Sequence, residues 1–165
     1  MFKTYIIRQL TILLIIFLIP SLGKTQNILF KKVKLCTFSI EIPIDMKIKK
    51  MNDSSPDYCD YEVSLKDGYT IMELHSLISS RFLVNTIRGL YDGALDGSDL
   101  EITYNMIGSD FFVISGINKE NGNIVYWKRI LAAEFVKDLH IEYNQSRKPD
   151  IEKYISRISK SFTSN

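Results

Sequence analysis

Apolar and polar residues alternate along residues 101–143, which is the pattern of strands in an antiparallel sheet. Two stretches rich in β-branched and aromatic residues, 111–117 and 124–131, flank Asn121-Gly122, a dipeptide that tolerates the positive φ angles of a type I′ turn. Alternation also runs through residues 101–106 and 135–143. This block therefore predicts four consecutive strands joined by short turns, a meander.

The strand predicted at 124–131 is apolar on both sides. One side carries Ile124, Tyr126 and Ile130, and the other carries Val125, Trp127 and Leu131. A strand of this kind needs cover on both faces of its sheet. Two helical patterns can supply the covers: residues 83–95, with Asn85 as a candidate N-cap and Gly97 as a stop, and a last helix after Pro149.

The first half of the chain predicts further strands. Residues 61–65 and 69–74 flank Asp67-Gly68, which favours a tight reversal and so a second hairpin. Met46 and Ile48 alternate with lysines, which is consistent with an exposed edge strand. Such lysines guard an edge against aggregation, although a basic patch for anionic lipid or polysaccharide is the alternative.

Residues 1–23 have the organisation of a secretory signal peptide. Lys3 and Arg8 precede an apolar run at 10–19, Pro20 follows it, and 21–23 provide the small residues of a cleavage site. The run is about half of the roughly 20 apolar residues that a membrane span needs. We therefore expect a signal peptide at 1–23 and a single domain at 24–165, in a periplasmic or secreted mature form that does not span the membrane. An uncleaved membrane anchor is the alternative.

Removal of the leader changes the charge balance. The chain has 21 Lys and Arg against 19 Asp and Glu, and the leader contains two of the bases and no acids, so the mature chain has 19 of each. A nucleic-acid partner would leave a basic footprint that this composition lacks. We therefore expect no nucleic-acid partner.

Cys36 and Cys59 are the only cysteines, and export would permit a disulfide between them. Each cysteine opens an apolar strand face. If these two strands pair directly and antiparallel, the cysteines lie about 20 Å apart at about 3.3 Å per residue, too far for a bridge. Free buried thiols are therefore expected. A disulfide remains open if residues 44–51 form an intervening strand.

Motifs for catalysis or metal binding are not evident in the sequence. His75 and His140 are the only histidines and neither has metal-ligand spacing, while the acids at 92–101 fail the EF-hand pattern. Serine elbows, cysteine–histidine motifs and phosphate-binding glycine loops are also missing. We expect no catalytic residue, no metal and no cofactor.

Trp127 and Arg129 lie on one face of a predicted strand, and residues of these two types often anchor interfaces. They are the candidate recognition residues. Burial of the pair beneath a helix is the alternative interpretation.

Several short segments resemble the PsbP-like family of small exported proteins. They occur in the family's order at 37–43 (TFSIEIP), 102–104 (ITY), 112–116 (FVISG), 123–128 (NIVYWK), 141–143 (IEY) and 155–162 (ISRISKSF). All are packing patterns, and none carries a catalytic or binding residue to transfer. The resemblance implies an α+β fold in which an antiparallel sheet of about six to seven strands is covered by helices on both faces, an α/β/α sandwich.

These observations favour an exported, non-catalytic binding or assembly module whose partner is another envelope protein. It would use a sheet edge or a groove beside the helices, marked by an exposed apolar patch with aromatic residues. The alternative is a metal-dependent or acid/base hydrolase whose site, including His75 or His140, assembles only in three dimensions. An immunity protein that binds a toxin is a further alternative.

Overall fold

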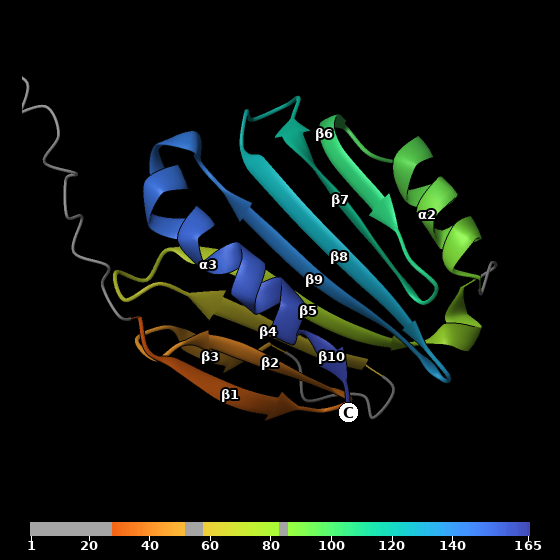
Figure 1. The fold of residues 1–165 in the computed structure, drawn as a ribbon, viewed down its shortest axis with the longest axis horizontal. Coiled ribbons are helices and arrows are strands. Elements are labelled where there is room, and N and C mark those ends of the chain that lie inside the picture. The colour runs from red at the N-terminus through yellow and green to blue at the C-terminus, as the bar shows by residue number, and fades with distance from the viewer. Residues whose placement is uncertain (1–27, 52–57, 83–85) are drawn as a thin grey trace, which may run out of the picture.

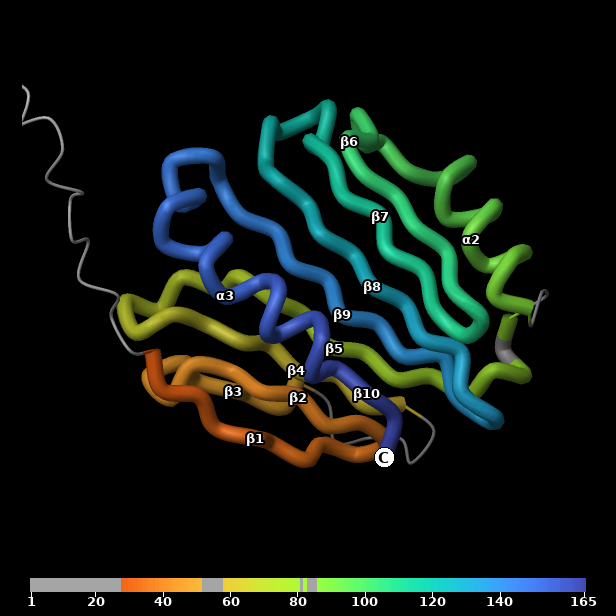
Figure 2. Tube along the Cα trace, viewed as in Figure 1, coloured from red at the N-terminus to blue at the C-terminus, as the bar shows by residue number. Residues whose placement is uncertain are grey.

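A computed structural model describes residues 28–51, 58–82 and 86–165. The predicted signal peptide at 1–23 and the proposed cap Asn85 lie outside the described residues. Figure 1 shows the arrangement of the described elements, and Figure 2 shows the same view as a trace.

Seven strands form the main antiparallel sheet, in the order β3-β4-β5-β9-β8-β7-β6. Their bounds are β3 Lys47–Lys50, β4 Tyr58–Ser64, β5 Thr70–Ile78, β6 Leu100–Ile107, β7 Phe111–Asn118, β8 Ile124–Ala132 and β9 Phe135–Tyr143. The last four strands are sequential neighbours, so the predicted meander is confirmed. The lysine-rich strand β3 lies at one edge of the sheet, also as expected.

Three further strands, β1 Phe30–Leu35, β2 Phe38–Pro43 and β10 Thr163–Ser164, form a small sheet in the order β1-β2-β10. The strand β2 is buried on both sides. Phe38, Ile40 and Ile42 join the core, while Ser39 Oγ contacts Thr163 Oγ1 at 3.2 Å. The second sheet was not predicted as a separate layer.

The helices are α2, Ile87–Asp96, and α3, Lys148–Ser161, with two 3₁₀ turns at Ser79–Arg81 and Gln145–Arg147. The cap of α2 is Thr86, whose hydroxyl accepts a hydrogen bond from the Gly89 N–H at 3.2 Å, and Gly97 ends the helix as predicted. Pro149 lies in the first turn of α3, where its missing N–H costs no helical hydrogen bond.

Two apolar cores lie on opposite faces of the main sheet. The larger core unites β4, β5 and β9 with β2 and α3, and the smaller one unites α2 with β7 and β9. Figure 1 shows α3 crossing in front of the middle strands, while α2 lies next to β6 at the other end of the sheet. The predicted covers are therefore present on both faces, but each helix covers only part of its face. The small sheet covers a further part of the face on which α3 lies.

Both predicted hairpins form, with one difference in turn type. Gly68 and Gly122 have positive φ values of 87° and 71°. Asn121 does not have a positive φ, so the Asn121-Gly122 turn is not the type I′ turn that needs positive φ at both positions. A longer loop replaces it, closed by Gly122 N–H bonding to the Asn118 carbonyl at 2.8 Å.

Cys36 and Cys59 form a disulfide, with their Cα atoms 6.5 Å apart. The expectation of free thiols is therefore wrong. It assumed that the strands following the two cysteines pair edge to edge, whereas β2 belongs to the small sheet and packs over the face of β4. Stacking of two sheets brings the two strand starts together, which direct antiparallel pairing would not.

Candidate functional site

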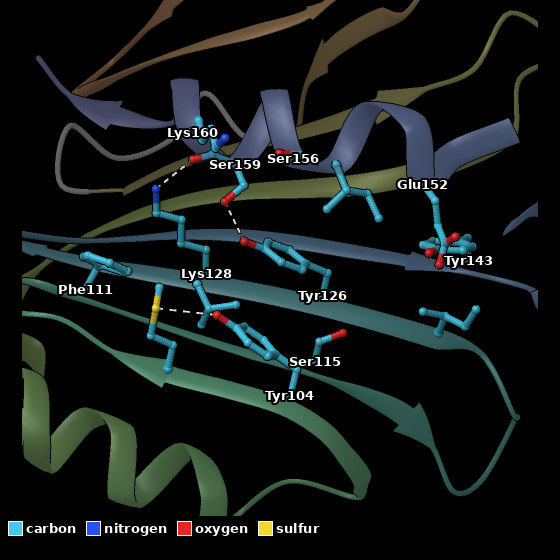
Figure 3. Close-up of a pocket in the computed structure, with 14 residues that line it drawn as sticks. Tyr104, Phe111, Ser115, Tyr126, Lys128, Tyr143, Glu152, Ser156, Ser159 and Lys160 are labelled. Atoms are coloured by element: carbon cyan, nitrogen blue, oxygen red, sulfur yellow. Dashed lines mark hydrogen bonds between the residues drawn. The ribbon is translucent and has the colours of Figure 1, made fainter. Parts of the chain in front are cut away.

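A groove of about 640 Å³ runs between α3 and the part of the sheet formed by β6, β7 and β8. Figure 3 shows the side chains that line it. They are Tyr104, Met106, Phe111, Val113, Ser115, Ile124, Tyr126, Lys128, Tyr143, Glu152, Ile155, Ser156, Ser159 and Lys160. Apolar atoms dominate this lining, which suits an apolar ligand or segment.

The groove exists because α3 covers only one part of the sheet face on which it lies. The helix packs on β2 and the larger core, and it leaves the same face of β6 and β7 without a helical cover. Every second residue of β7 then lines the groove, as Phe111, Val113 and Ser115 do. The result is a wall of α3, a floor of β7 and β8, and an outer rim of β6.

The rim is apolar and exposed. Tyr104 and Met106 are 51% and 42% exposed, and the Tyr104 hydroxyl contacts the Met106 sulfur at 3.5 Å. They pair with Ser115 and Val113, and the register of β6 shifts only before them, between Ile102 and Tyr104. Strict alternation from Ile102 would place it on the same face of β6 as Tyr104 and Met106. The register shift between Ile102 and Tyr104 interrupts that alternation.

Polar groups at one end of the groove hold α3 in place. The Lys128 ammonium donates to the Ser159 carbonyl at 2.7 Å and to the Phe162 carbonyl at 3.2 Å, where the last helical carbonyls lack helical partners. Burial lowers the pKa of Lys128, and the Asp110 carboxylate partly opposes that effect. The Lys128 ammonium therefore binds the C-terminal end of α3, which leaves it less available to a ligand.

Tyr126 links the groove floor to α3. Its hydroxyl is 2.5 Å from Ser159 Oγ, and burial raises the pKa of Tyr126. Figure 3 shows this contact as a dashed line in the middle of the groove.

Tyr143 is different, because its side chain is fully buried and its hydroxyl has no hydrogen-bond partner in the described part of the chain. Burial, together with the nearby Glu152 carboxylate, raises the pKa of Tyr143 to about 12. An unpaired buried hydroxyl costs free energy, so its presence in a groove lining is a feature that a bound polar group could relieve.

Trp127 and Arg129 lie on the opposite face of β8, in and around the smaller core. Arg129 makes a bidentate ion pair with Asp138 at 2.7 Å for each bond, and Trp127 Nε1 donates to the same carboxylate at 2.9 Å. The guanidinium carbon is 4.7 Å from the Trp127 ring centroid. These contacts satisfy both polar groups within the chain, so recognition by this pair stays a prediction.

His75 lies on the same face of the main sheet as Trp127 and Arg129, close to two acidic residues. Its Nδ1 is 2.8 Å from Asp60 Oδ1 and 3.3 Å from the Tyr58 hydroxyl, and its Nε2 is 3.4 Å from Glu73 Oε2. Both ring nitrogens therefore face groups of the chain itself. Burial, followed by the charge of Asp60, raises the pKa of Tyr58.

His140 lines a separate hollow of about 530 Å³ with Glu62, Glu73 and Glu142. The Glu142 carboxylate accepts bonds from the side-chain amides of Asn121 and Asn123 at 3.0 and 2.8 Å. Across residues 28–51, 58–82 and 86–165, no three His, Cys, Asp or Glu residues are grouped as metal ligands.

The groove residues were not predicted as a site. Tyr104, Met106 and Tyr143 fall within the alternating stretches at 101–106 and 135–143, and that pattern predicts strands without marking a site. A usable signal was present in β6, which has apolar residues and no lysine, in contrast to the lysines of β3.

Comparison with known proteins supports the architecture. Comparison with family models gives no match, and comparison with curated proteins gives no significant match. Among solved structures, the chain is similar to the cyanobacterial PsbP protein of Synechocystis sp. PCC 6803, with a TM-score of 0.52 and 11% identity over 89% of this chain and 99% of that one.

This chain has a PsbP-like fold. It is also similar to LpqN of Mycobacterium tuberculosis, a protein involved in cell envelope biogenesis, with a TM-score of 0.54 and 14% identity over 85% of this chain and 92% of that one. The resemblance to the PsbP-like fold drawn from the packing motifs is therefore confirmed. At these identities the similarity concerns the fold alone.

Proposed function

We propose that this protein is an exported, non-catalytic binding or assembly module that holds an apolar segment of another envelope protein in the groove beside α3. The observation that carries the proposal is the exposed apolar rim of Tyr104 and Met106, continuous with a mostly apolar groove. Exposed apolar surface of this kind marks interaction sites in folded proteins.

Other features support an exported location. The Cys36–Cys59 disulfide suits an oxidising compartment, as does the signal-peptide pattern of residues 1–23. One of the proteins of similar fold is involved in cell envelope biogenesis. In the described residues, no helix is long and apolar enough to cross a membrane.

Site-specific photo-crosslinking tests the proposal. A benzoylphenylalanine residue replaces Ser156 in the groove or, as a control, the exposed Glu73 on the opposite face, and the full chain is irradiated in cells that export it. We expect one envelope protein to be crosslinked at position 156 and not at position 73. Equal crosslinking at both positions, or none at position 156, contradicts the proposal.

A matched pair of methionine variants extends the test. Met106 in the rim and Met51 far from the groove are exposed to similar extents, 42% and 38%. A carboxylate opposes burial against an apolar segment, so Met106→Asp should reduce the crosslink at position 156 at least about tenfold. Met51→Asp should leave the crosslink unchanged.

The geometry around His75 favours one alternative, an acid/base hydrolase. The histidine does have two carboxylates and a tyrosine hydroxyl within 3.4 Å. However, the cluster lies on a sheet face and is held by its own internal contacts. Hydrolysis of a generic ester by the purified protein that is lost in His75→Ala, and kept in Met106→Asp, would favour this alternative over the binding module.

A further inference from the structure

The two edges of the main sheet are built differently. At one edge, β3 has four residues, three of them lysines, and this is a common defence against unwanted strand pairing. At the other edge, β6 has eight residues with no lysine and no proline. All six residues from Glu101 to Met106 are exposed, and no strand in the described part of the chain pairs with the outer side of β6.

The backbone register of β6 shows which groups are free. Gly108 N–H donates to the Phe111 carbonyl at 2.7 Å, and Met106 and Tyr104 continue the same alternation toward β7. In an antiparallel ladder, the intervening residues direct their N–H and C=O groups away from that neighbour. Asn105 and Ile107 therefore present unpaired backbone groups at the outer edge.

Most of the charged residues near the two ends of β6 are acidic. Asp96, Asp99 and Glu101 are exposed near its start and Asp110 is exposed near its end. Lys119 lies beside the first group through its backbone bond to Asp99, and its single charge does not offset three carboxylates. Near the other end, the Lys128 ammonium interacts with Asp110 but is bound to the last carbonyls of α3. An incoming strand with basic residues at its ends would complement this pattern.

We propose that the partner segment binds by adding a strand to the outer edge of β6. The segment is an extended stretch of another protein, with apolar residues at alternate positions and Lys or Arg at its ends. This inference rests on the proposed function and specifies its mode. Backbone groups of Asn105 and Ile107 supply the hydrogen bonds, and Tyr104 and Met106 contact the apolar side chains that extend the groove.

A second copy of this chain fits the edge less well. Antiparallel pairing of two copies about Asn105 would place Glu101 of one copy opposite Ser109 of the other, one residue from Asp110, at both ends of the pair. Like charges brought close together across an interface are unfavourable. The acidic ends of β6 therefore favour a basic heterologous strand.

A backbone-directed variant tests the mode of binding. Asn105→Pro removes the outward N–H, whereas Asn105→Ala keeps it, and both variants lose the bond that Asn105 Oδ1 accepts from the Tyr91 hydroxyl at 2.9 Å. The probe is a fluorescein-labelled peptide, Lys-Lys-Val-Thr-Val-Thr-Val-Lys-Lys, and the readout is fluorescence anisotropy with the full mature chain.

We expect the peptide to bind the unmodified protein and Asn105→Ala with affinities within about threefold, and Asn105→Pro at least about tenfold more weakly, because the peptide carbonyl loses its donor. The same peptide with Glu in place of Lys should also bind at least about tenfold more weakly. Equal binding to the Pro and Ala variants, or no binding of the lysine peptide, overturns strand addition.

A second measurement does not depend on the folding of the proline variant. Methylation of alternate peptide nitrogens blocks one edge of the peptide, so a peptide methylated on its pairing edge should lose binding to the unmodified protein, and one methylated on the other edge should keep it. Equal binding of the two peptides overturns the inference, as does a dimer in sedimentation that Asn105→Pro dissociates. The crosslink at position 156 would survive these outcomes if the proposed function is correct and only the mode is wrong.

Discussion

Tyr143 combines full burial with a polar group in the lining of the groove. Its hydroxyl is buried and has no partner among the described residues, and the Glu152 carboxylate of α3 lies nearby. A phenyl ring would fill the same space without the cost of the unpaired oxygen. This residue is therefore a sensitive reporter of the groove environment.

Tyr143→Phe should flatten the alkaline stability profile. With a folded pKa of about 12 against an ordinary value of 10.0, the tyrosine ionises first in the unfolded state. Its contribution to stability is complete below pH 10 and declines as the pH rises toward 12. Urea unfolding between pH 9 and 11.5 should show a shallower decline for Tyr143→Phe than for the control Tyr104→Phe, whose hydroxyl is exposed. Parallel profiles would contradict the assignment.

Arg129 should prove structural when it is removed. Its side chain and that of Asp138 are 14% and 9% exposed, and the loss of one partner leaves a buried charge unpaired. Arg129→Met should lower the free energy of unfolding by about 3 kcal/mol, measured by urea denaturation. The double variant Arg129→Met with Asp138→Asn should recover part of the loss. An unchanged free energy of unfolding in Arg129→Met would contradict a structural role for this ion pair.

At the scale of elements, the register shift between β6 and β7 decides the shape of the groove rim. Gly116 lies opposite this shift, and a Cβ atom there would lie 2.4 Å from the Glu101 carbonyl oxygen. Backbone atoms cannot move aside as the end of a side chain can. The shift takes Ile102, which pairs with Gly116, out of alternation with Tyr104 and Met106, so the glycine lies at the point where the rim ends.

Gly116→Ala should therefore destabilise the protein by about 1–3 kcal/mol. Gly93→Ala is the matched control, since nothing lies within 4 Å of its Cβ position on α2 and alanine is the better helix former. The control should be neutral or more stable by up to about 1 kcal/mol. Thermal melts of the two variants that shift in the same direction would argue against a close backbone approach at Gly116.

At the scale of the whole molecule, two sheets are held together face to face at their margin. The disulfide joins the turn before β2 to the first part of β4. The buried Lys137 of β9 adds a second tie, since its ammonium donates to the Thr37 carbonyl at 2.8 Å and contacts Ser164 of β10. These ties connect segments far apart in the sequence, close to the C-terminus (Figure 2).

Reduction of the Cys36–Cys59 disulfide should weaken the attachment of the small sheet to the main sheet. The disulfide spans 23 positions in the sequence, for which chain entropy predicts a stabilisation of about 3 kcal/mol. We expect dithiothreitol to lower the melting temperature of the unmodified protein and to have no effect on Cys36→Ser/Cys59→Ser. An unchanged melting temperature under conditions that reduce the bond, verified by thiol titration, would show that packing of β2 over β4 alone holds the sheets.

The sequence by itself determined what short-range physics encodes. Alternation set the meander, Asp67-Gly68 and Asn121-Gly122 set the hairpins, and the apolar stripes around α2 and α3 set two covering helices. Each signal is local, because strand periodicity, turn propensity and helix amphipathicity act over a few residues. The packing motifs also carried the PsbP-like fold, which the structural comparisons confirm.

Only the tertiary structure decided the features that depend on which faces of strands and helices pack together. Local pattern could not show that β2 leaves the main sheet, so the pairing of Cys36 with Cys59 was missed. Lys137 has the parity of Leu139 and Ile141, yet only the approach of Thr37 and Ser164 explains its burial. The groove arises because α3 packs on β2 and the larger core and leaves a space between itself and β6, and such a gap between layers has no counterpart in the order of residues along the chain.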